Sequence, residues 1–368
     1  MSGTLFGGRA LTRCGIMVGV RDAGVRDGLE LTEGNEYPKG DVRWSLNGKS
    51  LRMVMTLFVF LCAIPIRADQ APIVVALDGS GHFRTVQSAV DSIPDKSTEP
   101  RVIIIKPGRY EERLAINENK TFLTLRGEDK DASRTILTFN RYSGMEDPEG
   151  PGEKVGTTGS ESVLIQSNNF TAENITFENS AGEVAQAVAV RSTGDRQIFR
   201  NCRFIGWVDT LYVDGKRTYF RDCYVEGRID FIFGLGTAVF ENCHVHSKNG
   251  GIVTAAGTKP ETPFGLVFLK CKLTGAGGKA YLGQPWRGGA ATAFIGCELG
   301  NHLRPEGWRE WQGTENHKTA RFVEYGNTGP GANRAKRPAW TRQLNEAEAK
   351  TYTIENILRG EDRWNPTQ

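Results

Sequence analysis

Two aspartates, Asp209 and Asp230, are the residues of this sequence best suited to do chemistry. They lie 21 residues apart, the length of one sequence repeat, so their carboxyl groups would stack about one strand spacing apart, ~4.8 Å. Two carboxylates this close do not ionise equally, so one becomes a proton donor and the other an anion. Asp230 also stands in the apolar run 229–233, where an idle charge is unexpected. On spacing alone, a pair of turn-capping aspartates is an equal alternative.

Other catalytic patterns are weaker. The sequence has no G-x-S-x-G elbow, phosphate loop or dinucleotide fingerprint. His244 and His246 would share one face of a strand, but no third metal ligand is apparent. We therefore interpret them as exposed strand histidines and expect no metal site.

A short pattern that recurs along the chain places the two aspartates in neighbouring repeats. Each copy alternates apolar and polar positions and then breaks at Gly or Asn, as a strand and its turn do. From Cys202 onward, the copies follow at steps of 21, 20, 28 and 26 residues, too short for crossover helices. The copies occupy residues 173–177, 200–204, 221–225, 241–245, 269–273 and 295–299.

This spacing predicts an all-β fold, a single-stranded right-handed parallel β-helix. A jelly roll or sandwich is the alternative, but a fixed apolar position in every repeat favours stacked rungs. Residues 85–94 predict an amphipathic helix that caps the N-terminal end of the solenoid. We also expect an apolar strand at 102–105, and a polar tail with a short helical pattern at 344–349 along the outside.

Five of the seven cysteines fall at the inward position of the repeat. A small, soft side chain at one stacked position favours a packing ladder over a disulfide framework.

Composition excludes several classes of protein. The 368 residues are 39% hydrophobic and 24% charged, which is typical of a soluble globular protein. The net charge of +3 resides entirely in residues 1–68, and the other 300 residues carry 37 charges of each sign. A global basic field for nucleic acid is therefore excluded.

One segment reads as a targeting signal. Residues 53–66, MVMTLFVFLCAIPI, form an apolar run of 14 residues, whereas about 20 are needed to span a bilayer. We predict a signal peptide at 53–68, with a buried core helix as the alternative. Residues 1–52 are then a doubtful extension, with translation starting at Met53 or Met55, and the exported catalytic domain is 69–368.

Five sequence blocks and two further matches occur in order along the exported part. From about residue 73 to residue 366, the chain resembles the pectinesterases (pectin methylesterases). The resemblance implies a pectin-lyase-like right-handed parallel β-helix that de-esterifies pectin, releasing methanol and pectate. It also implies a secreted enzyme, extracellular or periplasmic, without metal or organic cofactor, and we expect a monomer. The matches are GRYEE at 108–112, QAVA at 186–189, DTL at 209–211, DFIFG at 230–234, LGQPW at 282–286, GWREW at 307–311 and WNP at 364–366.

The resemblance also implies roles for individual residues. Asp230 matches the family's nucleophile and Asp209 its general acid/base. Gln186 matches a glutamine that stabilises the oxyanion. Thr157 matches a threonine that contacts the substrate. Aromatic residues of the family's sugar-binding groove are matched by Tyr212, Phe233 and Trp286.

Two positions depart from the family pattern. Val208 stands where a second oxyanion glutamine is usual, and losing one such donor typically costs about 10²–10³ in kcat. Gln284 replaces an arginine that pairs with the nucleophile, and an amide can bond that carboxylate without adding charge. We hypothesise that Arg228 compensates, because residues i and i−2 share a strand face and its guanidinium would reach Asp230.

These departures keep two rivals to the esterase open. One is a non-catalytic pectin-binding homologue, and the other is an esterase of shifted specificity for another acyl ester or thioester. A polygalacturonase is less favoured because the matching blocks are esterase blocks. The reaction products distinguish these hypotheses. An esterase releases methanol, a polygalacturonase creates new reducing ends, and a binding protein does neither.

Overall fold

The computed structural model describes residues 44–46, 49–51 and 71–367. The chain divides into two compact units, residues 1–67 and 68–368. In the first unit, β1 (Trp44–Leu46) pairs antiparallel with β2 (Lys49–Leu51). The predicted signal peptide at 53–68 lies outside the described residues, as does most of the extension at 1–52. None of the helices in the described part of the chain is long and apolar enough to cross a membrane.

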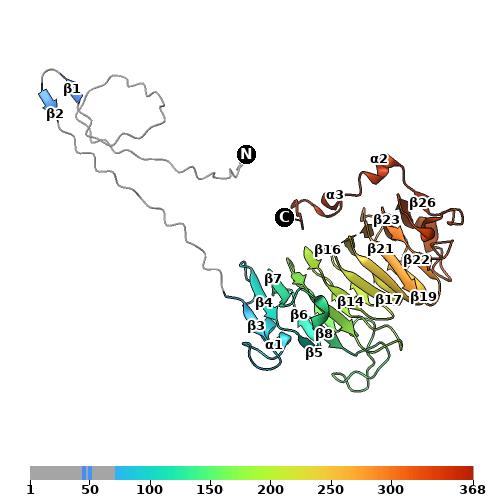
Figure 1. Cartoon of the computed structure of the whole chain (residues 1–368), viewed down its shortest axis with the longest axis horizontal. Coiled ribbons are helices and arrows are strands. Elements are labelled where there is room, and N and C mark those ends of the chain that lie inside the picture. The colour runs from blue at the N-terminus through green and yellow to red at the C-terminus, as the bar shows by residue number, and fades with distance from the viewer. Residues whose placement is uncertain (1–43, 47–48, 52–70, 368) are drawn as a thin grey trace, which may run out of the picture. The chain divides into compact units, whose positions relative to one another are not determined.

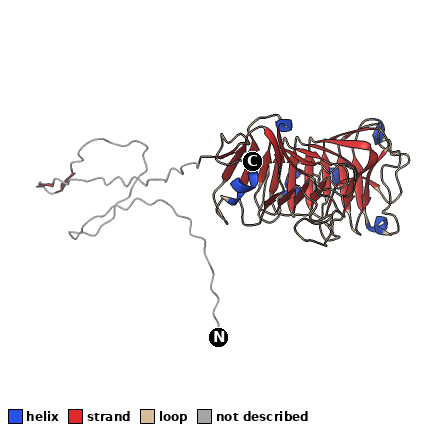
Figure 2. Cartoon of the chain, turned by 90° about the horizontal axis from the view of Figure 1, so that it is seen from below, coloured by secondary structure: helices blue, strands red, loops and turns tan. Residues whose placement is uncertain are grey.

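The second unit is a stack of parallel strands, visible as successive arrows in Figure 1 and as red layers in Figure 2. Its strands form two large sheets of 11 and 13 strands. The first sheet contains β3 (Ile73–Val75), β4 (Arg101–Ile105), β7 (Leu123–Gly127), β10 (Thr171–Glu173), β13 (Gln197–Arg200), β16 (Arg217–Arg221), β18 (Thr237–Glu241), β20 (Leu266–Leu269), β23 (Ala291–Ile295), β25 (Arg321–Tyr325) and β26 (Arg342–Gln343). The second contains β5 (Gly108–Glu111), β6 (Leu114–Ile116), β8 (Thr135–Phe139), β9 (Val163–Ile165), β11 (Thr176–Asn179), β12 (Val190–Ser192), β14 (Arg203–Ile205), β15 (Leu211–Val213), β17 (Tyr224–Gly234), β19 (His244–Ala256), β21 (Lys272–Ala276), β22 (Ala280–Pro285) and β24 (Glu298–Leu299).

From β4 to β24, each rung contributes one strand to the first sheet and at least one to the second, so the predicted parallel β-helix is confirmed. The recurring Asn or Asp of the sequence pattern makes the turn between the sheets. Asn201, Asp222 and Asn242 have φ values of 49°, 54° and 53°, a left-handed conformation that Asn and Asp tolerate better than other side chains. The residue after each turn enters the core, which explains why the pattern recurs.

The core repeats from rung to rung. Phe220 stacks on Phe240 with ring centroids 4.5 Å apart, and Phe240–Phe268 and Phe268–Phe294 follow at 4.7 and 4.4 Å. These distances match the ~4.8 Å strand spacing because the rings occupy one register position. The predicted cysteine ladder is also confirmed, since all five thiols are free and buried: Cys202, Cys223, Cys243, Cys271 and Cys297.

The predicted capping helix is present as α1 (Val86–Asp91), whose N-cap Thr85 accepts a hydrogen bond from the Ser88 backbone. The helix buries Val86, Ala89 and Val90 in the main core, beside β3, β4 and β6. It therefore covers the apolar end of the first rung, as its amphipathic pattern predicts.

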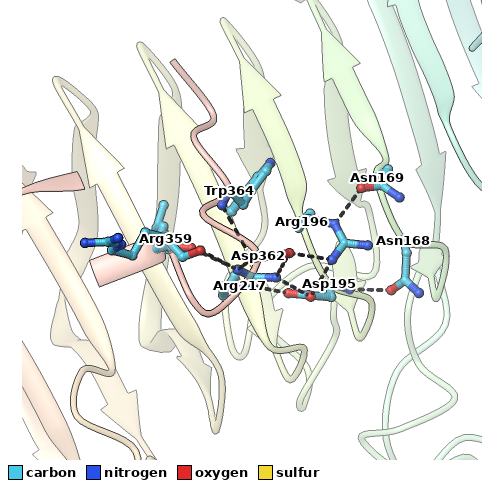
Figure 3. Close-up of polar contacts among 9 residues, drawn as sticks. Asn168, Asn169, Asp195, Arg196, Arg217, Arg359, Asp362 and Trp364 are labelled. Carbon is cyan, nitrogen blue, oxygen red and sulfur yellow. Dashed lines mark hydrogen bonds and ion pairs between the residues drawn. The ribbon is translucent and has the colours of Figure 1, made fainter. Parts of the chain in front are cut away.

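The C-terminal segment lies along the outside of the first sheet. It contains α2 (Glu346–Ala349) and α3 (Ile354–Leu358), and the latter packs against β18. Arg217 ties the segment to the solenoid (Figure 3), because its guanidinium bonds Asp362 at 2.5 Å and Asp195 at 2.7 Å. Three 3₁₀ helices complete the described elements: η1 (Ala132–Arg134), η2 (Asn316–Thr319) and η3 (Pro330–Ala332).

Candidate active site

Parallel backbone bridges align the segments that carry the two aspartates. Gln186 pairs with Val208, and Val208 pairs with Ile229 on the next rung. Asp209 and Asp230 follow directly, and the Asp209 backbone N–H donates to the Ile229 carbonyl at 3.1 Å. The two aspartates therefore occupy equivalent positions on neighbouring rungs, as their spacing predicts.

Both aspartates have left-handed backbone conformations, with φ of 62° at Asp209 and 50° at Asp230. Such a conformation costs an L-residue roughly 1–2 kcal/mol, and strain of this kind concentrates at functional sites. Here it interrupts the strand alternation, and both side chains line one pocket.

The pocket has a volume of about 340 Å³. Seven of the nine predicted site residues line it: Thr157, Gln186, Asp209, Tyr212, Asp230, Phe233 and Trp286. The sequence reading missed three further lining residues, Thr158, Ala255 and Trp311. Trp311 belongs to the matched block at 307–311, so a signal for it existed without an assigned role.

Aromatic rings form one wall of the pocket. Tyr212 and Phe233 lie on neighbouring rungs and stack with centroids 4.3 Å apart and planes at 18°. Trp286 presents its ring nearly at right angles to both, at 6.4 and 6.0 Å. The arrangement offers a rigid apolar surface with few rotatable bonds.

Gln284 lies behind Asp230 rather than in the lining. Its side-chain amide nitrogen donates to both carboxylate oxygens of Asp230, each at 2.9 Å. Both residues are less than 10% exposed, so water competes little for these bonds. Two donated bonds stabilise the ionised form of Asp230.

The two carboxyl groups differ in pKa. Burial raises the pKa of Asp209 to about 8, and the nearby charge of Asp230 adds to the rise. Burial also raises the pKa of Asp230, to about 7, against the opposing effects of the Gln284 hydrogen bond and the positive charge of Arg309. Between these values, Asp230 is ionised while Asp209 keeps its proton.

Arg228 does not reach Asp230. Its guanidinium is paired with Glu183, and Arg228 is absent from the pocket lining. The expectation assumed regular alternation, but the register of β17 against β19 shifts twice between Gly227 and Ile232. Because of these shifts and the left-handed conformation of Asp230, residues two apart no longer share a face.

Among the described residues, no group of three His, Cys, Asp or Glu side chains is placed to hold a metal ion. His244 and His246 instead share the hydroxyl of Thr274, at 2.7 and 2.8 Å.

Comparison with known proteins identifies the family of the chain. The pectinesterase family model matches residues 72–361. Pectinesterase 31 of Arabidopsis thaliana is 41% identical over 290 residues, which cover 77% of this chain and 91% of that protein. The chain belongs to the pectinesterase family.

Other pectinesterases resemble it over different shares of their length. A probable pectinesterase/pectinesterase inhibitor of Brassica napus is 38% identical over 302 residues, and the chain spans only 50% of it. The structure of a pectin methylesterase from carrot superposes with a TM-score of 0.73 at 31% identity, covering 80% of this chain and 95% of that one. The resemblance stated from the sequence blocks is thereby confirmed.

The two residues of this pectinesterase that depart from the family pattern, Val208 and Gln284, both lie next to residues of the candidate active site. Val208 lies beside Gln186 on the next rung, and its own carbonyl accepts from the Ala187 backbone at 3.0 Å. Its side chain has no hydrogen-bond donor to offer the pocket. Gln284 is in direct contact with Asp230 but adds no charge.

Proposed function

We propose that this esterase de-esterifies methyl-galacturonate units of pectin, releasing methanol and pectate. The observation that carries the proposal is the stacked pair of Asp209 and Asp230, one protonated and one ionised near neutral pH, in an aromatic-walled pocket. The rings of Tyr212, Phe233 and Trp286 offer flat apolar surface to the C–H face of a sugar.

In the first half of the reaction, a carboxylate oxygen of Asp230 attacks the C6 carbonyl carbon of the ester. The carbonyl electron pair moves onto oxygen and gives a tetrahedral oxyanion. As this intermediate collapses, the bond to the methoxy group breaks and that oxygen takes the proton of Asp209. Methanol leaves, and an acyl-enzyme anhydride on Asp230 remains.

In the second half, the Asp209 carboxylate accepts a proton from water while the water oxygen attacks the acyl carbon. Breaking the bond between that carbon and the Asp230 oxygen restores the Asp230 carboxylate and frees the galacturonate product. Asp209 ends protonated, ready for the next ester.

The oxyanion in both halves needs hydrogen-bond donors. The Gln186 side chain lines the pocket and supplies one, whereas Val208 supplies none from its side chain. A missing donor typically lowers kcat by about 10²–10³. We therefore propose an active but slow esterase, with Thr157 contacting the substrate.

We also propose how the chain is processed and where the enzyme acts. A signal peptide at 53–68 would export a catalytic domain of residues 69–368, and residues 1–52 would be an extension that is not translated. The enzyme would then meet its substrate pectin as a monomer outside the cell or in the periplasm, without a cofactor.

Methanol release from highly methylated pectin tests the proposal, with Asp230→Asn as the matched control. Release by the wild type that the control abolishes would support it. No release by the wild type, with pectin still bound, would instead support a non-catalytic pectin-binding protein, which the departures at Val208 and Gln284 favour. Release of methanol only from other acyl esters would support shifted specificity.

A further inference from the structure

A lysine outside the pocket contacts the turn that leads into Asp209. This residue, Lys248, belongs to β19, which lies two rungs beyond that turn, because β14 pairs with β17 and β17 with β19. Its side chain reaches back across β17 and donates to the carbonyl of Gly206, the residue that follows β14, at 3.2 Å. Lys248 does not line the pocket, and the reaction described above gives it no role.

The ammonium of Lys248 makes three contacts at the turn, as many as it has N–H groups. Besides the Gly206 carbonyl, it bonds Glu226 Oε1 at 3.0 Å and lies 3.9 Å from the centroid of the Trp207 ring. The Lys248 and Glu226 side chains are only 21% and 18% exposed. Water therefore screens the ion pair and the cation–π contact less than it would on an open surface.

Trp207 connects this lysine to both aspartates. The Trp207 carbonyl accepts from the backbone N–H groups of Arg228 at 2.6 Å and Ile229 at 3.3 Å. Two residues after Trp207, the Asp209 N–H donates to the Ile229 carbonyl at 3.1 Å, and Asp230 is the residue that follows Ile229. A movement of Trp207 would therefore displace Asp209 relative to Asp230.

The backbone of Asp209 needs such support. Its φ of 62° lies in the left-handed region, and a side-chain-bearing residue keeps that conformation only where the surrounding contacts determine it. On the buried side of the turn, Thr210 Oγ1 donates to the Glu226 carbonyl at 3.1 Å. The ammonium of Lys248 holds the same turn through Gly206 and Trp207.

We propose that Lys248 is a positioning residue that holds the turn at 206–207 so that Asp209 can protonate the departing methanol. The inference rests on the proposed function of Asp209 as general acid. Proton transfer needs the carboxyl group within hydrogen-bond reach of the leaving oxygen. A displacement of about 1 Å can cost about 10²-fold in rate.

Lys248→Met tests the proposal, because it keeps a long unbranched side chain and removes the ammonium. We expect kcat/KM for methanol release from methylated pectin to fall about 10- to 100-fold. For the trifluoroethyl ester of polygalacturonate, kcat/KM should fall less than about threefold, because the more acidic alcohol leaves with little help from an acid. Lys248→Arg keeps a cation that can bond Glu226 and lie over Trp207, and it should retain most activity on the methyl ester.

Lys272→Met is the matched control. Lys272 belongs to β21, the strand next to β19, and pairs with Glu298 at 3.3 Å. The change removes the same charge and another ion pair between neighbouring rungs, so it should leave both esters at the wild-type rate.

Trp207→Leu removes the ring beneath the ammonium and should reproduce the difference between the two esters. An undiminished rate in Lys248→Met, an equal loss on both esters, or an equal loss in Lys272→Met would overturn the proposal.

If the wild type releases no methanol, hydrogen exchange still decides. In the full chain, the backbone amides of residues 206–211 should exchange with deuterium faster in Lys248→Met than in the wild type, while those of β23 keep their rate. Unchanged exchange at 206–211, or an equal increase along the whole chain, would refute the role of Lys248 independently of the proposed function.

Discussion

The amide of Gln284 donates to both carboxylate oxygens of Asp230, at 2.9 Å each. A neutral carboxylic acid would have to turn its own proton toward one of these N–H groups, so the arrangement favours the anion. Burial pushes in the opposite direction. The balance leaves Asp230 titrating near neutral pH, which determines when the enzyme works.

We expect a bell-shaped pH dependence of kcat/KM. Activity should rise as Asp230 loses its proton near its pKa of about 7, and fall as Asp209 loses its proton near its pKa of about 8. Methanol release measured from about pH 5 to about pH 10 checks this. An optimum on the acid side of pH 6 would contradict the assignment of the ionised form to Asp230.

Asp209→Asn should stabilise the fold at alkaline pH. The pKa of Asp209 is raised from 3.8 to about 8 on folding. The free energy of unfolding is therefore highest below the unfolded pKa, where Asp209 is protonated in both states. It falls as pH rises towards the folded pKa, because burial then opposes ionisation of Asp209. Asn carries no charge, so its advantage in free energy of unfolding over the wild type should grow across this range, by up to roughly 5–6 kcal/mol for a pKa rise of about four units.

Urea unfolding at the two ends of that range measures this difference. Asp222→Asn is the control, because Asp222 has the same left-handed conformation, with φ of 54°, on an exposed turn. Equal behaviour of the two variants would show that the burial of Asp209 carries no cost.

Val208→Gln should accelerate the reaction. It adds an amide donor beside Gln186, so we expect kcat to rise about 10-fold or more while KM changes little, since the donor acts on the oxyanion. Val184→Gln makes the same change at a side chain that is 60% exposed and should have no effect. A fall in kcat for Val208→Gln would mean that this pocket has no room for the amide.

Phe240→Ala should be severely destabilising. Phe240 stacks on both Phe220 and Phe268, so the truncation opens a cavity in the middle of the column and should cost about 3–5 kcal/mol. Phe122→Ala removes a ring that is 38% exposed and should cost much less. Denaturant unfolding compares the two, and similar losses would show that the column is not the main source of stability.

Because the strand-and-turn pattern repeats along the chain, most of this fold could be predicted from the sequence. Asn201, Asp222 and Asn242 mark the turns because few side chains accept their conformation, and the cysteine that follows each one marks the inward position. The same periodicity predicts that Asp209 lies next to Asp230.

The sequence reading failed where local geometry leaves the repeat. Alternation predicted that Arg228 would reach Asp230, but left-handed backbone and register shifts in β17 direct it to Glu183. Lys248 could not be found from spacing, because its side chain reaches back across β17 to the Gly206 carbonyl. Contacts of that kind depend on the direction of one side chain, which the repeat does not specify.

The clasp formed by Arg217 and Asp362 bears on how the solenoid melts. In a solenoid each rung contacts only its neighbours, so unfolding can start at an end and proceed stepwise. Here Asp362 of the C-terminal segment is paired with Arg196 and Arg217 near the middle of the stack. Peeling away the C-terminal rungs first requires releasing that distant anchor. The fraying of one end is thereby coupled to the integrity of the centre, which converts a stepwise process into a more cooperative one.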